Sequence, residues 1–303
     1  MLAPIEDIFC EIDDFCKNFY HNQSQHLLSN PLSKRMRPCR LAASEVMTII
    51  VLFHLSHYRS FKDYYHECVI KYLRPYFPQL LSYKRFVELK SAVIPVLAVY
   101  MRHKAGAQTG LYYIDFTTLK VCRNQRIYRH KVFNKIAARG KSSMGWFFGF
   151  KLHLVINHNG EIMSFCLTPG NIDDRKPMES LFKHLKGIAY GDKGYISENK
   201  ATSLLAQGIS FVTQTKANMK KVARSVFEKY LLAQRSIIET VIEQLKSICL
   251  IEHSRHRKPD NFLANTLAAL IAYTLKPRKP SIGQRFLTTC DKSSLHRTEV
   301  ILI

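Results

Sequence analysis

The sequence predicts an α/β protein in which a mixed sheet is flanked by helices and preceded by an all-helical N-terminal domain. Apolar side chains recur at helical spacing in the first third of the chain. From Leu111 onward, extended runs rich in aromatic and β-branched residues alternate with helical segments. The 303 residues, 47% of them hydrophobic, suffice to bury a large core. We therefore expect a helical domain at residues 1–105, a sheet domain at 106–280 and a polar tail at 281–303.

The helical domain is expected to contain four helices. One begins at Ile5, and Ser44 is placed to cap a second. Further helices are predicted at residues 61–73 and 83–103. The last of these is interrupted at Pro95, because proline has no backbone N–H to donate within a helix.

Two polar segments of this domain suggest contact with DNA. The linker at residues 30–40 is basic and punctuated by proline, so it is predicted to be a loop suited to lie on a phosphate backbone. Near a helix junction lies a polar aromatic cluster consisting of His54, His57, Tyr58, Arg59, Lys62, Tyr64, Tyr65 and His66. Helix pairs of this kind can enter a DNA groove. Simple solvation of the linker and packing between the helices explain the same residues equally well.

The sheet domain is expected to alternate strands with helices. A strand is predicted at residues 111–118, and a hairpin turn at 158–160 joins strands at 145–157 and 161–167. The remaining elements are predicted as a helix at 177–185, a strand from Gly187 to Asp192, a helix at 197–207, a strand at 209–214 and, as the last major helix, residues 234–246. Strands and helices in this order are typical of a mixed sheet covered by helices.

The charge composition favours nucleic acid as the partner. The chain has 45 Lys and Arg against 23 Asp and Glu, a formal net charge of +22. An anionic membrane surface is the competing partner, but the basic residues form no polybasic tail or amphipathic anchor. The N-terminal segment is acidic, unlike a signal peptide, and the longest apolar runs are too short to span a bilayer. The eight cysteines include no C-x-x-C pair, which favours reduced thiols in a cytosolic protein.

Residues 116–160 concentrate the positive charge, because they contain no Asp or Glu. The nine cations of this stretch are Lys120, Arg123, Arg126, Arg129, Lys131, Lys135, Arg139, Lys141 and Lys151. A stretch of one sign would hold an anionic polymer beside Asp115, which precedes it. We expect Lys120, Arg123, Arg126 and Lys131 in particular to bind DNA.

Three carboxylates are candidate metal ligands. Asp115 is a lone acid in an apparently buried strand, where an unpaired charge is costly. Asp192 falls at a strand end, and Glu239 shares one helix face with Arg235 and Lys246. If the three converge, their oxygens suit Mg²⁺ or Mn²⁺. A solvated ion-pair ladder is the simpler explanation of the helix face.

Other acids remain as alternatives at two of these positions. Glu243, one turn beyond Glu239, is the rival on the helix. Asp173 and Asp174 are rivals of Asp192, although a loop that contains proline and glycine holds a ligand less rigidly than a strand end does.

The chain resembles the DDE transposases of bacterial insertion sequences, and the insertion-sequence-982 group most closely, over about residues 5–280. The residues that carry the resemblance are Asp115, the turn Gly191-Asp192-Lys193-Gly194-Tyr195, and the pattern Arg235-x3-Glu239-x6-Lys246. In the wider family a tyrosine stands three residues before the arginine, where this chain has Leu232.

The resemblance implies a ribonuclease H-like catalytic domain and a transposase that cuts the ends of an insertion element and joins the freed 3′-OH to target DNA. Asp115, Asp192 and Glu239 would then hold two Mg²⁺ or Mn²⁺ ions, and Arg235 and Lys246 would contact DNA near the cut end. It also implies a nucleoid-associated cytoplasmic protein that assembles on DNA as a homodimer or higher oligomer. A structure-specific nuclease without strand transfer and an inactive DNA-binding relic remain as alternatives.

Overall fold

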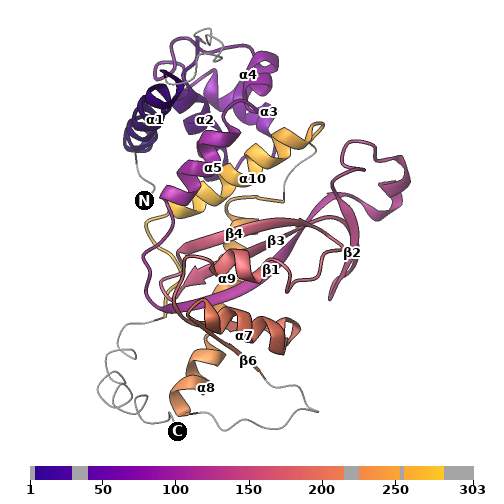
Figure 1. The fold of residues 1–303 in the computed structure, drawn as a ribbon. Coiled ribbons are helices and arrows are strands. Elements are labelled where there is room, and N and C mark those ends of the chain that lie inside the picture. The colour runs from indigo at the N-terminus through magenta and orange to yellow at the C-terminus, as the bar shows by residue number, and fades with distance from the viewer. Residues whose placement is uncertain (1–3, 29–39, 215–224, 253–255, 283–303) are drawn as a thin grey trace.

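The computed structural model describes residues 4–28, 40–214, 225–252 and 256–282, in which a helical region is stacked on an α/β region (Figure 1). The helical region contains α1 (Ile5–Leu28), α2 (Ala43–Leu55), α3 (Phe61–Asp63), the π-helical η1 (Tyr64–Val69), α4 (Tyr83–Leu89) and α5 (Ile94–His103). A helix from far along the chain, α10 (Pro259–Thr274), packs against α2 and α5. Segments near both ends of the described chain therefore build the helical region.

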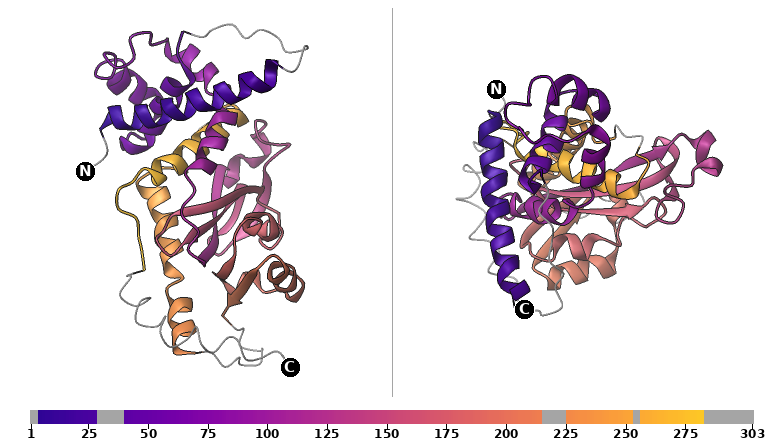
Figure 2. Two further views of the ribbon diagram at one scale, coloured as in Figure 1. Left: turned by 60° about the vertical axis from the view of Figure 1, so that its left-hand side comes forward. Right: turned by 90° about the horizontal axis from the view of Figure 1, so that it is seen from above.

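A six-stranded mixed sheet forms the α/β region. Its strands are β1 (Leu111–Cys122), β2 (Ala138–Ser142), β3 (Gly145–Asn157), β4 (Ile162–Pro169), β5 (Gly187–Gly191) and β6 (Ile209–Thr213). β3 pairs antiparallel with β1, β2 and β4, whereas β5 pairs parallel with β1 and β6. The predicted α/β fold class is confirmed, and the curled mixed sheet flanked by helices is consistent with a ribonuclease H-like fold (Figure 2).

Helices cover both faces of this sheet. They are α6 (Met178–Phe182), α7 (Glu198–Ala206), α8 (Val226–Ala233) and α9 (Ser236–Ser247). α6 and α7 pack over the face that carries Tyr112 and Ile114. α8 and α9 lie over the other face, where the Tyr113 hydroxyl donates a hydrogen bond to the Leu231 carbonyl at 3.2 Å. Because alternate residues of a strand face opposite sides, Asp115 lies on the α9 face together with Tyr113.

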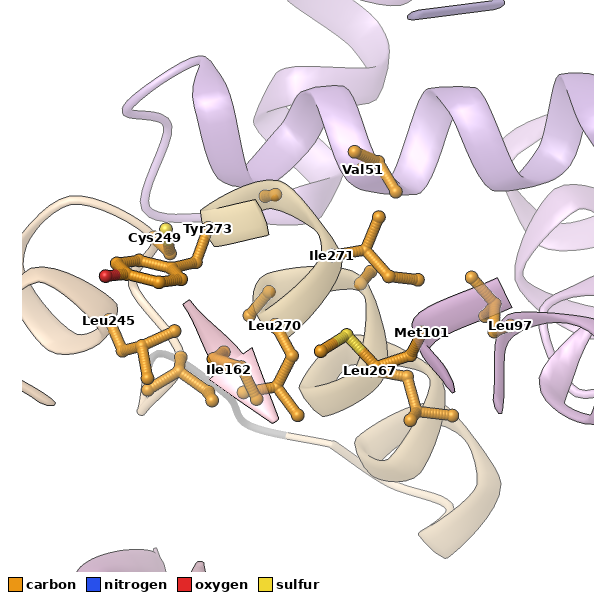
Figure 3. Packing of buried hydrophobic residues seen from close by; sticks show 14 of the residues in the cluster. Val51, Leu97, Met101, Ile162, Leu245, Cys249, Leu267, Leu270, Ile271 and Tyr273 are labelled. Atoms are coloured by element: carbon orange, nitrogen blue, oxygen red, sulfur yellow. The ribbon is translucent and has the colours of Figure 1, made fainter. Parts of the chain in front are cut away.

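The core between the two regions is built around α10. Leu270 and Ile271 of this helix are fully buried, and they pack among side chains from α2, α5 and β4 (Figure 3). The Tyr273 hydroxyl donates a hydrogen bond of 2.7 Å to the Gly160 carbonyl in the β3–β4 turn. The apolar run of α10 thus joins the helical region to the sheet.

No described helix is both long enough and apolar enough to cross a membrane.

Three predictions for the helical domain are wrong in detail. Ser44 does not cap α2, because its hydroxyl donates to Asp13 in α1 at 2.6 Å while the Ala42 N–H at the N-cap is bound by Glu45. Residues 61–73 do not form one continuous helix, since α3 passes into the π-helical η1 and then into turns. Residues 83–103 are interrupted as predicted, but the break lies between Leu89 and Ile94 and not at Pro95. Pro95 lies in the first turn of α5, where a missing N–H costs nothing.

The polar aromatic cluster of residues 54–66 contributes partly to packing. His54, Tyr64 and Tyr65 are buried in the core, where the rings of Tyr64 and Tyr65 lie against Phe61. Packing between helices therefore explains these three side chains. The basic linker lies outside the described residues except for Arg40, as does the tail from residue 283. All described cysteines are free thiols.

The sheet domain departs from the prediction in four respects. The polar strand β2 was not expected, and neither was the short helix α8. The helix predicted at 234–246 begins at Ser236, so that Arg235 is its N-cap residue. It is also not the last major helix, because α10 follows it.

Candidate active site

Asp115 lies in the middle of the sheet, on the central strand β1. β1 pairs with β3 on one side, where Leu154 is the partner of Asp115, and its first residues pair with β5 on the other side. The side chain is one-fifth exposed, and its Oδ1 accepts a hydrogen bond from the Phe116 N–H at 2.8 Å. Burial raises the pKa of Asp115 to about 6, against the opposing influence of the Phe116 N–H and of Arg235.

Asp192 follows directly after β5, beside the strand that carries Asp115. Tyr113 of β1 pairs with Tyr190 of β5, and Asp115 and Asp192 each lie two residues further along these parallel segments. Both aspartates line one cavity. The preceding Gly191 is required for close packing, because a Cβ there would lie 2.6 Å from the Phe211 ring. The negative charge of Asp192 is close enough to raise the pKa of Asp115.

Glu239 and Arg235 project from the start of α9. The helix buries Ile237, Ile238 and Val241 against the sheet and leaves Glu239 more than half exposed. Arg235 lies one turn earlier and reaches across to both acids. Its Nη2 is 2.7 Å from the Glu239 Oε1, and its Nη1 is 3.4 Å from the Asp115 Oδ2.

One open cavity of about 490 Å³ brings these side chains together. Its lining includes Asp115, Asp192, Arg235, Glu239 and Lys246, which are the five residues that the sequence placed at the site. Lys246 binds Glu252 at 2.9 Å and is about one-third exposed. Ser142 at the end of β2 and Ser143 and Met144 in the β2–β3 turn also line the cavity, and the sequence did not single them out.

Comparison with known families identifies the region that contains this cavity. Residues 105–259, about half of the chain, match the transposase DDE domain family. The chain belongs to this family. A comparison with curated proteins gave no match. The family assignment makes the protein a DDE transposase in the broad sense, with DNA as its implied partner.

The chemistry of the three acids of the DDE domain suits a hard divalent cation. The distances between their side chains in this structure are too long for all three to hold one ion. Carboxylate oxygens are the ligands that Mg²⁺ and Mn²⁺ prefer, and all three acids line one solvent-accessible cavity. Even so, no three Asp, Glu, His or Cys side chains of the described residues stand close enough together to hold an ion. The guanidinium of Arg235 lies between Asp115 and Glu239. It supplies the positive charge that these two carboxylates share.

Of the three rival acids, only Glu243 lies in the cavity of the proposed metal ligands. Glu243 lines the same cavity as Glu239. Asp173 is instead bound by Arg175, and Asp174 accepts a salt bridge of 2.7 Å from Lys151. Neither aspartate lines the cavity. The geometry therefore favours Asp192 over both of them.

Leu232, where the wider family has tyrosine, is buried in the core at 7% exposure. A side chain at this position of α8 packs inside the DDE domain. The departure therefore does not alter the lining of the cavity that holds the acids.

The basic residues of the acid-free stretch that were expected to bind DNA lie apart from the carboxylates, unlike Arg235 and Lys246. Lys120, Arg123 and Arg126 line a second cavity at the far end of β1, which shares no lining residue with the first. Lys131 lies just beyond η2 (Asn124–Arg129) and is exposed. Trp146 lines this second cavity as well. It went unnoticed in the sequence because an aromatic residue in an extended run is typical of a core strand.

Proposed function

We propose that this DDE transposase cleaves phosphodiester bonds at the ends of an insertion element and joins the freed 3′-OH to target DNA. The observation that supports the proposal is that Asp115, Asp192 and Glu239, from three distant segments, line one cavity with the cations Arg235 and Lys246. The acids suit metal ions, and the cations suit the phosphates of a DNA strand.

The residues of the cavity divide the work of an in-line displacement. Asp115, Asp192 and Glu239 would hold two Mg²⁺ or Mn²⁺ ions, which when bound activate the attacking hydroxyl group and stabilise the leaving oxygen. Lys246 and Arg235 orient the DNA strand by binding its phosphates. The cavity is open to solvent, so a DNA strand can enter it, and Asp115 is held on the central strand of the sheet.

Several finer assignments belong to the same proposal. The turn Gly191-Asp192-Lys193-Gly194-Tyr195 and the Arg235-x3-Glu239-x6-Lys246 pattern support membership of the insertion-sequence-982 group. The net charge of +22 supports association with the nucleoid in the bacterial cytoplasm. Assembly as a homodimer or higher oligomer on DNA would let one complex hold two element ends.

An assay of cleavage and joining tests this function. The substrate is a labelled DNA end taken from the flank of the gene, incubated with the protein and Mg²⁺ or Mn²⁺. We expect both cut strands and products joined to a second DNA. Cut strands without joined products would support a nuclease, and binding without either product would support an inactive relic.

A further inference from the structure

The second cavity of the protein is larger than the one that holds the acids. It has a volume of about 790 Å³ and lies where β1 passes into η2. Four cations line it, namely Lys120, Arg123, Arg126 and Arg257, and none of its described lining residues is acidic. A cavity lined only by positive charges attracts an anionic ligand, because without one the cations repel each other.

Two distant parts of the chain form the walls of this cavity. One wall is an arm made of η2, β2 and the adjoining ends of β1 and β3, which projects from the body of the protein (Figure 2). The other wall comes from His256 and Arg257, just before α10. The arm and the body thus enclose a groove that is open to solvent.

Trp146 is the second residue of β3, and 54% of its surface is exposed. Its partner across the ladder is Lys141 of β2. The Lys141 Nζ and the Arg139 Cζ each lie 5.8 Å from the centroid of the indole ring. Asn124 fixes the backbone by donating a hydrogen bond of 2.7 Å to the Trp146 carbonyl. The indole is therefore held in place by its strand while much of its surface stays available for a ligand.

A large aromatic surface beside several cations selects a particular anionic polymer. Phosphates of a duplex would need only the cations, because the bases of a duplex are already stacked on one another. An unpaired strand offers both phosphates and free base faces, and stacking of a base on an aromatic side chain is worth about 1–3 kcal/mol. Arginine next to the ring strengthens such stacking further.

We infer that this groove binds single-stranded DNA, with one base stacked on Trp146 and the adjoining phosphates bound by Arg123 and Arg126. The inference rests on the proposed function, because cleavage at an element end supplies a strand that can separate from its complement. The groove would then hold an unpaired stretch of the same DNA whose phosphodiester bond enters the carboxylate cavity.

Trp146 makes a direct test possible, because it is the only tryptophan among the 303 residues. The full-length protein is titrated with a short oligothymidine in EDTA, while tryptophan fluorescence and the anisotropy of a label on the oligonucleotide are followed together. We expect saturable quenching by the single strand, since a base stacked on the indole quenches its emission. A blunt duplex of the same length is expected to bind with little quenching.

Variants separate stacking from general attraction. Trp146→Ala should weaken binding of the labelled oligothymidine by about tenfold, with duplex affinity nearly unchanged, and Trp146→Phe should retain most of the affinity. Tyr72→Ala is the matched control, because it removes an exposed aromatic side chain from the helical region instead. Arg123→Ala and Arg126→Ala should each weaken binding and lower its salt dependence.

The Asp115→Asn variant keeps this inference distinct from the proposed function. It should lose cleavage yet quench as fully as wild type, because the groove shares no residue with the carboxylate cavity. Unchanged fluorescence when anisotropy shows the oligonucleotide bound would overturn the inference and leave the transposase proposal intact. Equal affinity of Trp146→Ala and wild type for oligothymidine would overturn it as well.

Discussion

Arg235 donates a hydrogen bond of 2.7 Å to Glu239, one turn further along α9, and its other terminal nitrogen lies 3.4 Å from Asp115. One guanidinium thus compensates two acids that are proposed to hold metal. Arg235 and a divalent cation both bring positive charge to the same carboxylate oxygens, so we expect them to compete. Arg235, which the resemblance assigns to DNA contact, would then also neutralise the carboxylates of Asp115 and Glu239 when no metal ion is bound.

The first prediction is that Arg235→Ala binds Mn²⁺ more tightly than wild type, on the order of fivefold, because the competing cation is removed. Isothermal titration of the DNA-free protein with Mn²⁺ measures this. Lys246→Ala is the control, since Lys246 pairs with Glu252 rather than with the three acids, and it should change the affinity much less. Weaker Mn²⁺ binding by Arg235→Ala would show that the guanidinium supports the metal site instead.

Lys90 provides a prediction about pH. Its side chain is 3% exposed, and its Nζ lies 3.6 Å from the centre of the Phe61 ring. Burial lowers the pKa of Lys90 from 10.5 to about 7. Between these two values the unfolded chain holds more protons than the folded protein, so stability should rise with pH across this window.

Lys90→Met should remove that rise and stabilise the protein at neutral pH by up to a few kcal/mol, because a neutral side chain of similar length replaces a buried cation. Urea unfolding at neutral and at alkaline pH measures the difference. Lys71→Met changes an exposed lysine of the same region and should leave the pH dependence in place. If wild type and Lys90→Met depend on pH equally, Lys90 is not the group that titrates.

A third prediction concerns the core that joins the two regions. Leu270→Ala should lower the free energy of unfolding by about 2–5 kcal/mol, because Leu270 is fully buried in α10 and its removal leaves a cavity. Leu263→Ala on the same helix is the control, since Leu263 is about one-third exposed, and it should cost much less. Chemical unfolding followed by circular dichroism provides both values. Similar costs for the two variants would mean that α10 does not form the core described here.

The positions of the acids followed from short-range patterns in the sequence. A lone acid in a buried extended run placed Asp115 on a strand, and the glycine turn placed Asp192 at a strand end. Both patterns depend only on the period of a strand and on local backbone freedom, which neighbouring residues reveal. The helix face shared by Arg235, Glu239 and Lys246 could be predicted for the same reason.

Features that depend on tertiary partners could not be predicted in this way. β2 is a polar strand with no hydrophobic alternation, and it forms because β3 offers its edge. An apolar run such as that of α10 does not indicate which helices it will pack against. The reach of Arg235 to Asp115 joins residues 120 positions apart in sequence. The exposure of Trp146 likewise depends on the way the arm projects from the body.

Carboxamide substitution of the three acids is the most direct test of the central claim. Asp115→Asn, Asp192→Asn and Glu239→Gln preserve side-chain size but remove a negative charge, so each should lower cleavage and joining by roughly a thousandfold or more. Binding of the labelled element end in a gel shift should stay close to wild type. Glu243→Gln, in the same cavity, should keep most of the activity. A carboxamide variant that cuts and joins DNA at the wild-type rate would contradict the assignment of that acid as a metal ligand.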